Sequence, residues 1–192
     1  RQDRETIMTL ILRSQSQAKY SSENVGHFGL ALTHYAHFTS PIRRYSDLIV
    51  HRLLIASLDL ASEGGVKYSR KQVDEIAEHI SKTERVSQKA EWDSKERMIA
   101  RFYSNKINKM FTAQVVSVNT FGMFIRIPET GAEGLLPFRS MKNDFYIYDD
   151  KTNTLRGKRT RKVVTVGTKM KVKLHQANIV FGKLSFDFVN FV

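Results

Sequence analysis

The sequence predicts an α+β chain in which a mainly helical part is followed by a small closed β-barrel. Up to about residue 107, apolar residues recur at steps of three and four, as on one face of a helix. From Phe111 onward they alternate with polar residues, as in half-buried strands. The change of period predicts a boundary near residue 110, so we expect one domain over 1–109 and a second over 110–192.

Two of the expected helices follow from apolar stripes. Within residues 5–19, Ile7, Met8, Ile11 and Leu12 recur at helical steps and predict a short core helix. Residues 70–107 contain neither glycine nor proline, and their apolar residues keep the same period. This segment predicts one long helix or two abutting helices.

A further helix is expected to begin at Pro41. Proline favours the first turn of a helix, because its nitrogen carries no hydrogen and would have no partner there in any case. Thr39 or Ser40 is expected to cap this helix, and Gly64 and Gly65 are expected to end it.

Five β-type segments are expected after residue 110, separated by turn residues. Five short strands in about 80 residues fit a small closed barrel such as an OB-fold. The segments are TAQVVSV, GMFIRI, EGLLP, TKMKVKL and KLSFDF.

The chain is strongly basic, with 31 Lys and Arg against 19 Asp and Glu and a formal net charge of +12. Such a charge favours a polyanionic partner, and we expect nucleic acid rather than an anionic membrane surface. Residues 111–192 hold 13 Lys and Arg against 6 Asp and Glu, so the predicted barrel is the more basic part per residue.

The chain has no cysteine. Disulfides, zinc–thiolate sites and thiol nucleophiles are therefore excluded, and a reducing compartment such as the cytoplasm is expected. No run approaches the roughly 20 apolar residues of a membrane span, so no membrane association is expected.

The stretch HFTSPIRRYSD, residues 37–47, places Arg43 and Arg44 at the start of the helix expected after Pro41. A helix start has unpaired N–H groups and the positive end of the helix dipole, so two cations there are unfavourable unless an anion is bound. One interpretation is a phosphate held by the arginines. The alternative is that both arginines pair with a nearby carboxylate such as Asp47.

Four histidines lie in the same region, at His27, His34, His37 and His51. The spacing of His34 and His37 is used in metal sites, but no cysteine or paired acid completes a ligand set. Packing around the HFTSPIRRYSD segment, or hydrogen bonding to it, is therefore the expected role.

Longer stretches resemble the ribonuclease II / ribonuclease R family of processive 3′-to-5′ exoribonucleases, over nearly the whole chain. GHFGLALTHYAHFTSPIRRYSDLIVHRLL at 26–54 resembles a signature of the catalytic domain, and KAEWDSKERMIARF at 89–102 resembles the helix that closes it. VVSVNTFGMFIRI and GAEGLLPFRSM resemble the S1-type RNA-binding domain that follows. The insert MKNDFYIYDDKTNTLRGKRTRK is more similar to ribonuclease R than to ribonuclease II.

The resemblance implies a fold and an activity. The fold is the mainly helical C-terminal part of a ribonuclease II-type catalytic domain, followed by a five-stranded OB-fold barrel. The activity is hydrolytic degradation of single-stranded RNA to nucleoside 5′-monophosphates.

The resemblance also implies residue roles. Arg43 would be catalytic, stabilising charge at the scissile phosphate with its planar, permanently charged group. Arg44 and Tyr45 would contact RNA and, with Asp47, support that geometry. Glu91 in AEWD would lie near the terminal nucleotide, with an exposed helix carboxylate of no special role as the alternative.

Magnesium is the cofactor that the resemblance implies, held in the family by an aspartate cluster near the start of the catalytic domain. We expect no metal ligand in this chain, which looks like an excerpt from a longer protein, and place the metal site upstream. The chain alone is then expected to bind RNA without cutting it. The aspartates of residues 1–110 are scattered singly, at Asp3, Asp47, Asp59, Asp74 and Asp93.

In the barrel, Phe121 and Phe124 flank Gly122 in a pattern that presents rings for base stacking in this type of domain. For Phe124, a place in the core is the open alternative. Pro137 replaces the histidine usual in the family, which puts one standard contact in doubt, and Phe138 after it is a candidate RNA contact.

The segment RGKRTRK at 156–162 has five cations in seven residues. Arg159, Arg161 and Lys162 are expected to touch phosphates, with a solvated loop as the alternative. Tyr146 and Tyr148 beside this segment are candidates for stacking on bases.

The rival hypothesis is a non-catalytic RNA-binding protein that carries an S1 barrel and a helical appendage. HFTSPIRRYSD argues against it, because a pure binding module does not need that motif. A catalytically inactive member of the family stays open. In each case we expect single-stranded RNA as the partner and a monomeric protein.

Overall fold

The computed structural model describes residues 7–8, 11–12, 14–150 and 152–192. The chain forms two compact units. One is Ser16–Lys89, and the other contains Ala90–Val192 together with the described residues before Ser16. A helix, α3 (Arg70–Ser104), supplies its first half to one unit and its second half to the other. Within the described ranges, no helix combines the length and apolarity that a membrane span requires.

The helix expected over 5–19 lies partly outside the described residues. Ile7, Met8, Ile11 and Leu12 are helical, in agreement with their spacing. All four side chains are nevertheless about half-exposed or more, so the expectation that they form a core stripe is wrong.

Ser16–Lys89 begins with a long loop that contains one 3-10 turn, η1 (Phe28–Leu30). The helix α2 (Tyr45–Leu58) follows. It starts four residues later than expected, because residues 41–43 form a turn in which the Arg44 N–H donates to the Ser40 carbonyl at 3.0 Å. Arg44 is the N-cap residue and has extended backbone, so Pro41 lies before the helix rather than in its first turn.

The end of α2 also differs from the expectation. Asp59 adopts the left-handed conformation, with φ of 51°, and its N–H bonds to the Ile55 carbonyl. The helix therefore ends before Gly64 and Gly65 are reached. Gly65 has another role, since a Cβ there would lie 2.9 Å from the Ala56 nitrogen. The returning chain passes this close to α2 only without a side chain at that position.

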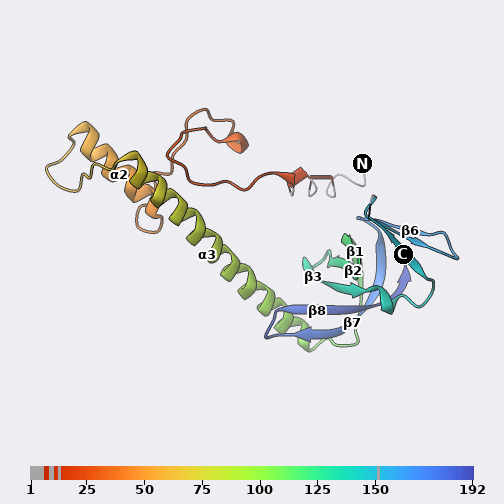
Figure 1. The fold of residues 1–192 in the computed structure, drawn as a ribbon. Helices are drawn as coiled ribbons and strands as arrows, with labels where there is room; N and C mark the ends of the chain where they lie inside the picture. The colour runs from red at the N-terminus through yellow and green to blue at the C-terminus, as the bar shows by residue number, and fades with distance from the viewer. Residues whose placement is uncertain (1–6, 9–10, 13, 151) are drawn as a thin grey trace. The chain divides into compact units, whose positions relative to one another are not determined.

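The long helix α3 is a single helix of 35 residues, which confirms one of the two forms expected for residues 70–107 (Figure 1). Its start is fixed by Ser69 and Gln72. The Ser69 hydroxyl accepts from the Gln72 N–H at 3.3 Å, and the Ser69 N–H donates to the Gln72 side chain at 2.9 Å. This is a capping box, which satisfies helix-end donors at both residues.

The five expected strands are all present and close into one barrel in the order β1-β2-β3-β8-β7, which confirms the OB-type prediction. All neighbouring pairs are antiparallel except β3 and β8, which are parallel. The strands are β1 (Met110–Asn119), β2 (Gly122–Ile127), β3 (Ala132–Pro137), β7 (Lys169–Asn178) and β8 (Lys183–Phe191).

The end of α3 packs on this barrel. Ala100 and Tyr103 are buried in the same apolar cluster as inward-facing residues of the five strands. The Tyr103 hydroxyl bonds to the Thr130 hydroxyl at 2.7 Å, and Lys183 pairs with Glu96 at 2.8 Å. The second half of α3 is thus an integral part of the barrel unit.

The insert forms a second sheet that the sequence patterns did not predict. After the 3-10 turn η2 (Phe138–Ser140), three short strands pair in the order β4-β5-β6. Its buried residues Leu155 and Val164 join the barrel core. The strands are β4 (Tyr146–Asp149), β5 (Thr154–Gly157) and β6 (Val163–Val164).

Candidate nucleic-acid interface

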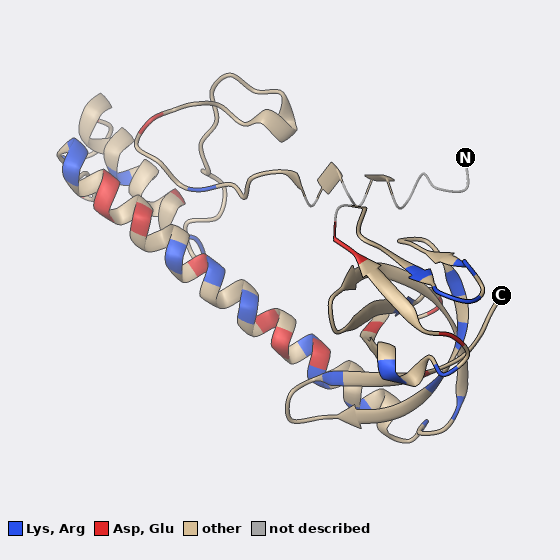
Figure 2. Cartoon of the chain, turned by 45° about the vertical axis from the view of Figure 1, so that its right-hand side comes forward, with Lys and Arg blue, Asp and Glu red and all other residues tan. Residues whose placement is uncertain are grey.

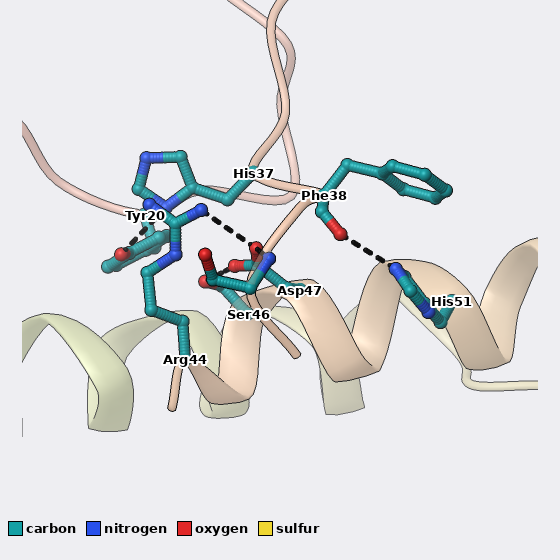
Figure 3. Close-up of polar contacts among 8 residues, drawn as sticks. Tyr20, His37, Phe38, Arg44, Ser46, Asp47 and His51 are labelled. Carbon is teal, nitrogen blue, oxygen red and sulfur yellow. Dashed lines mark hydrogen bonds and ion pairs between the residues drawn. The ribbon is translucent and has the colours of Figure 1, made fainter. Parts of the chain in front are cut away.

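Asp47 is the centre of the HFTSPIRRYSD segment. Its carboxylate is fully buried and accepts hydrogen bonds from the Ser40 N–H and Arg44 Nη2, both at 2.8 Å, and from the Ser46 hydroxyl at 3.0 Å (Figure 3). Burial raises the pKa of Asp47, but these three hydrogen bonds and the charge of Arg44 outweigh it and lower the pKa below 3.8. Asp47 is therefore an ionised anchor for the turn before α2.

The two arginines of the motif have different surroundings. Arg44 keeps an exposed fraction of 28% and is bound to Asp47, which confirms the pairing alternative for this residue. Its Nε atom is buried without a hydrogen-bond partner. Arg43 is exposed, and its side chain has no hydrogen bond or ion pair to any residue that the structure describes. The turn therefore leaves the guanidinium of Arg43 available to an anion.

Two of the four histidines hydrogen-bond around this segment, as expected, whereas His27 and His34 bond outside it. His51 Nε2 donates to the Phe38 carbonyl at 2.7 Å, and His37 Nδ1 shares a hydrogen bond with the Tyr20 hydroxyl at 3.0 Å (Figure 3). The Tyr20 N–H in turn donates to the Ser81 hydroxyl of α3 at 3.0 Å. These bonds hold the loop before Pro41 to both α2 and α3 of its unit.

No group of three or more His, Asp or Glu residues in the described part of the chain could hold a metal ion. The described residues therefore do not supply a ligand set for the divalent ion that the family resemblance implies, and no step of a reaction is derived through that ion.

Tyr45 and Glu91 are both at the surface. Tyr45 is the first residue of α2 and is about half-exposed. Glu91 is exposed on α3 and has neither a hydrogen bond nor an ion pair within the described ranges. Their predicted contacts with RNA stay predictions.

On the barrel, Phe121 lies in the tight turn between β1 and β2 with an exposed fraction of 59%. Its ring meets the partly buried ring of Phe124 edge-on, with centroids 6.4 Å apart. Gly122 between them allows the close approach of β3, since a Cβ there would lie 2.8 Å from the Leu136 carbonyl oxygen. Phe121 is thus an exposed ring on a tight turn, a position open to base stacking.

The other aromatic candidates are less open. Phe138 is partly buried against the barrel core, and its N–H bonds to the Phe121 carbonyl. Tyr146 and Tyr148 also pack against the core, because alternate residues of β4 face the barrel. Their predicted stacking on bases is untested, but their inward position makes them less accessible than Phe121.

The RGKRTRK segment is ordered by Asp144, a residue that the motifs did not single out. Its carboxylate accepts from the Thr160 hydroxyl at 2.6 Å and from the N–H groups of Thr160 and Arg159 at 2.7 and 3.0 Å. The hydroxyl and N–H of Thr160, with the N–H of Arg159 and of Phe145, outweigh burial and hold the pKa of Asp144 well below 3.8. Gly157 fits beside this carboxylate only because it lacks a Cβ.

The three predicted phosphate contacts of this segment are all exposed. Arg159 Nη2 donates to the Asn143 carbonyl at 2.9 Å, and Lys162 Nζ lies 3.8 Å from the centre of the Phe191 ring. Arg161 has a left-handed backbone, with φ of 55°. None of the three forms an ion pair with a described carboxylate, so their charges remain open to an external anion.

The distribution of charged residues also favours the barrel as the surface that binds RNA. Figure 2 shows Lys and Arg alternating with Asp and Glu along α3, whereas Lys and Arg predominate on the strands that follow. This agrees with the excess of 13 Lys and Arg over 6 Asp and Glu in residues 111–192. A polyanion is therefore attracted to the barrel more than to α3.

Comparison with known proteins gives matches at both ends of the chain. Residues 1–59 match the RNB domain, and residues 105–178 match the S1 RNA binding domain. Ribonuclease R of Thermotoga maritima is 40% identical over 190 residues, covering 97% of this chain and 26% of the relative. Ribonuclease R of Aquifex aeolicus is 38% identical over 98% of this chain and 27% of the relative.

Solved structures give the same result. The apo form of Mycoplasma genitalium RNase R matches with a TM-score of 0.86 and 29% identity, over 96% of this chain and 29% of that protein. The same enzyme in complex with ribose-methylated single-stranded RNA matches with a TM-score of 0.85.

The chain spans about a quarter of the length of the curated relatives that it matches. The two domain matches and the four matches over nearly the whole chain agree with the resemblance expected from HFTSPIRRYSD and from the barrel motifs. The chain carries RNB-domain sequence followed by an S1 RNA binding domain, and over nearly all of its own length it is similar to ribonuclease R.

Proposed function

We propose that this chain is the C-terminal part of a processive 3′-to-5′ hydrolytic exoribonuclease that degrades single-stranded RNA to nucleoside 5′-monophosphates. The observation that carries the proposal is the similarity to ribonuclease R over 97% of the chain, which includes the whole HFTSPIRRYSD segment. A binding module needs only the barrel and would have no use for an exposed arginine on an anchored turn.

Within this proposal, Arg43 stabilises charge at the scissile phosphate. Support comes from the contrast between the two arginines, because Arg44 is held by Asp47 while the guanidinium of Arg43 is free of described partners. A guanidinium offers two parallel N–H donors to a phosphate, which a lysine cannot do. Asp47 and Arg44 position the turn that carries Arg43.

The barrel is proposed to hold the RNA strand on its way to the reaction site. Support comes from the exposed ring of Phe121, the cations of RGKRTRK that form no ion pair with a described residue, and the RNA-bound state of the similar Mycoplasma genitalium enzyme. We also propose magnesium as the metal of the whole enzyme, held outside the described residues, and a monomeric protein in the cytoplasm.

The experiment compares Arg43→Lys with the unchanged enzyme in a chain extended upstream to the length of its relatives. Loss of a transition-state donor costs about 10² to 10³ in turnover, whereas RNA affinity changes little because the positive charge is kept. Single-turnover rates and equilibrium affinity for a labelled RNA separate the two effects. Arg85→Lys, an exposed arginine of α3, is the matched control.

Residues 1–192 alone are assayed beside the extended chain. They are expected to bind RNA and to leave it uncut in the presence of magnesium. A small, equal loss of turnover and affinity in Arg43→Lys would make this arginine a binding residue. Trimming of RNA by residues 1–192 would contradict an upstream metal site.

A further inference from the structure

The outer face of the β4-β5-β6 sheet carries large apolar side chains that point away from the barrel core. Because alternate residues of a strand face opposite ways, the inward position of Tyr146 and Tyr148 turns Phe145 and Ile147 outward. Phe145 has an exposed fraction of 70%, and Ile147 and Val163 are each about half-exposed.

Cations are interleaved with these apolar residues. Arg156 is the register partner of Ile147 on one side and of Val163 on the other. The Lys158 N–H donates to the Phe145 carbonyl at 2.8 Å, which places Lys158 beside Phe145. Neighbouring strands lie about 4.8 Å apart, so each apolar side chain has a positive charge next to it.

Neither Arg156 nor Lys158 forms an ion pair with any residue that the structure describes. An apolar face meant for another protein would favour pairs that neutralise such cations, whereas an exposed aromatic ring, here Phe145, beside cations without ion pairs suits a single strand of nucleic acid. The charge of this face therefore favours a polyanionic occupant.

Asp144 anchors both ends of this sheet segment, and the start of the insert is tied to the turn that carries Phe121. Asp144 accepts the Phe145 N–H at 2.7 Å and holds the other end of the sheet through Thr160. The insert leaves the barrel through η2, whose first residue Phe138 bonds to the Phe121 carbonyl. The insert that carries the face therefore begins next to Phe121 in the structure.

We propose that Phe145, Ile147, Arg156, Lys158 and Val163, here called the outer insert face, form a second contact surface for single-stranded RNA. A base stacks on Phe145, and Arg156 and Lys158 neutralise the flanking phosphates. The proposal rests on the RNA binding proposed for the barrel and deepens it, because Arg156 and Lys158 belong to RGKRTRK and the apolar residues of the sheet are added to them.

The test uses purified residues 1–192 and fluorescence anisotropy with labelled oligouridine. RNA lengths of about 4 and about 16 nucleotides bracket the site size of such barrels. Phe145→Ala is expected to weaken binding of the longer RNA at least about five-fold, by loss of one stacked base, with a smaller effect on the shorter RNA. The double variant Arg156→Ala, Lys158→Ala is expected to reduce the slope of log affinity against log salt by about 1.4.

Phe181→Ala is the matched control. Phe181 has the same exposed fraction of 70%, but it lies at the tip of the β7-β8 hairpin, where the neighbouring Lys183 is paired with Glu96. It is expected to leave both affinity and slope unchanged. Circular dichroism verifies that each variant is folded.

The outcomes separate the two proposals. If Phe121→Ala weakens binding while Phe145→Ala behaves like Phe181→Ala, the outer insert face does not contact RNA, and the RNA binding of the barrel stands. An unchanged salt slope in the double variant would show that Arg156 and Lys158 do not contact phosphates, which contradicts that part of the proposal. If the unchanged chain does not bind either RNA, the proposed function fails before the outer insert face is in question.

Discussion

Two arginine-rich segments of this chain are each ordered by one aspartate, in two different ways. Asp47 is fully buried and binds an arginine side chain, a hydroxyl and one N–H. Asp144 remains partly exposed and binds the hydroxyl of Thr160 and three N–H groups of the chain. The Asp47 carboxylate binds a charged side chain, whereas the Asp144 carboxylate binds mainly backbone N–H groups.

The surroundings explain the difference. Among the described residues, the buried hydrophobic side chains of Ser16–Lys89 are Ile49 and Ala77 alone, while all others belong to the barrel unit. The turn before α2 therefore depends on the hydrogen bonds of Asp47 for its stability. The RGKRTRK segment, in contrast, lies on the β4-β5-β6 sheet, whose Leu155 and Val164 are buried in the barrel core. The comparison teaches that Asp47 is needed for the fold of its region, and Asp144 only for the order of its loop.

The largest effect is expected from Asp47→Ala. It leaves Arg44, Ser46 and the Ser40 N–H without their acceptor in a buried place. Such a loss costs about 2–3 kcal/mol, at the low end for a broken buried pair because Arg44 is partly exposed. Urea unfolding of residues 1–192, followed by circular dichroism at the helix band, measures it.

Ser46→Ala is the control for Asp47→Ala, because it removes one hydrogen bond to the same carboxylate. It is expected to cost about 1 kcal/mol. Equal losses in the two variants would mean that Asp47 contributes no more than a single hydrogen bond, and the comparison between the two segments would break.

A smaller effect is expected from Asp144→Asn, and on binding rather than stability. The barrel core is untouched, so the unfolding transition should not move. RNA affinity should fall about two- to ten-fold, because the loosened loop must be ordered when RNA binds. Glu129→Gln, an exposed acid in the turn between β2 and β3, changes the net charge equally and should not weaken binding. A shift of the unfolding midpoint in Asp144→Asn would contradict the separation of the two roles.

The smallest effect is a pH dependence. Asp47 has a pKa below the ordinary value of 3.8, so it contributes stability that is fully present above pH 3.8 and is lost as pH falls through the folded-state pKa. The stability difference between the unchanged chain and Asp47→Asn should be constant from pH 7 to pH 5 and shrink below 3.8. A stability difference that instead grew as the pH fell would contradict a lowered pKa of Asp47 in the folded protein.

Much of the fold could be predicted because its patterns are long. The helical period over residues 70–107 corresponds to α3 in the structure. The five alternating segments correspond to the five strands of the closed barrel. The β4-β5-β6 sheet was missed because its strands have two to four residues, too few for a period to emerge. The alternation in FYIYD was the one available signal.

The candidate site was only partly predictable for a related reason. Proline at the start of an apolar stripe favours a first helical turn, but the hydrogen bond from the Ser40 N–H to Asp47 holds residues 41–43 in a turn instead. The division of roles between Arg43 and Arg44 depends on that turn, so spacing alone left the pairing with Asp47 open. Asp144 was missed because three of its four partners are backbone N–H groups, which leave no mark in the sequence.

A salt titration of RNA binding tests most directly whether the barrel holds RNA by ordered cations and an exposed ring. In residues 1–192, replacing Arg159, Arg161 and Lys162 by Ala should flatten the slope of log affinity against log salt by up to about 2, at about 0.7 for each phosphate contact. Phe121→Ala should weaken binding by about 1–3 kcal/mol at every salt concentration and leave the slope nearly unchanged. An unchanged slope in the triple variant, together with unchanged affinity in a folded Phe121→Ala, would contradict the account.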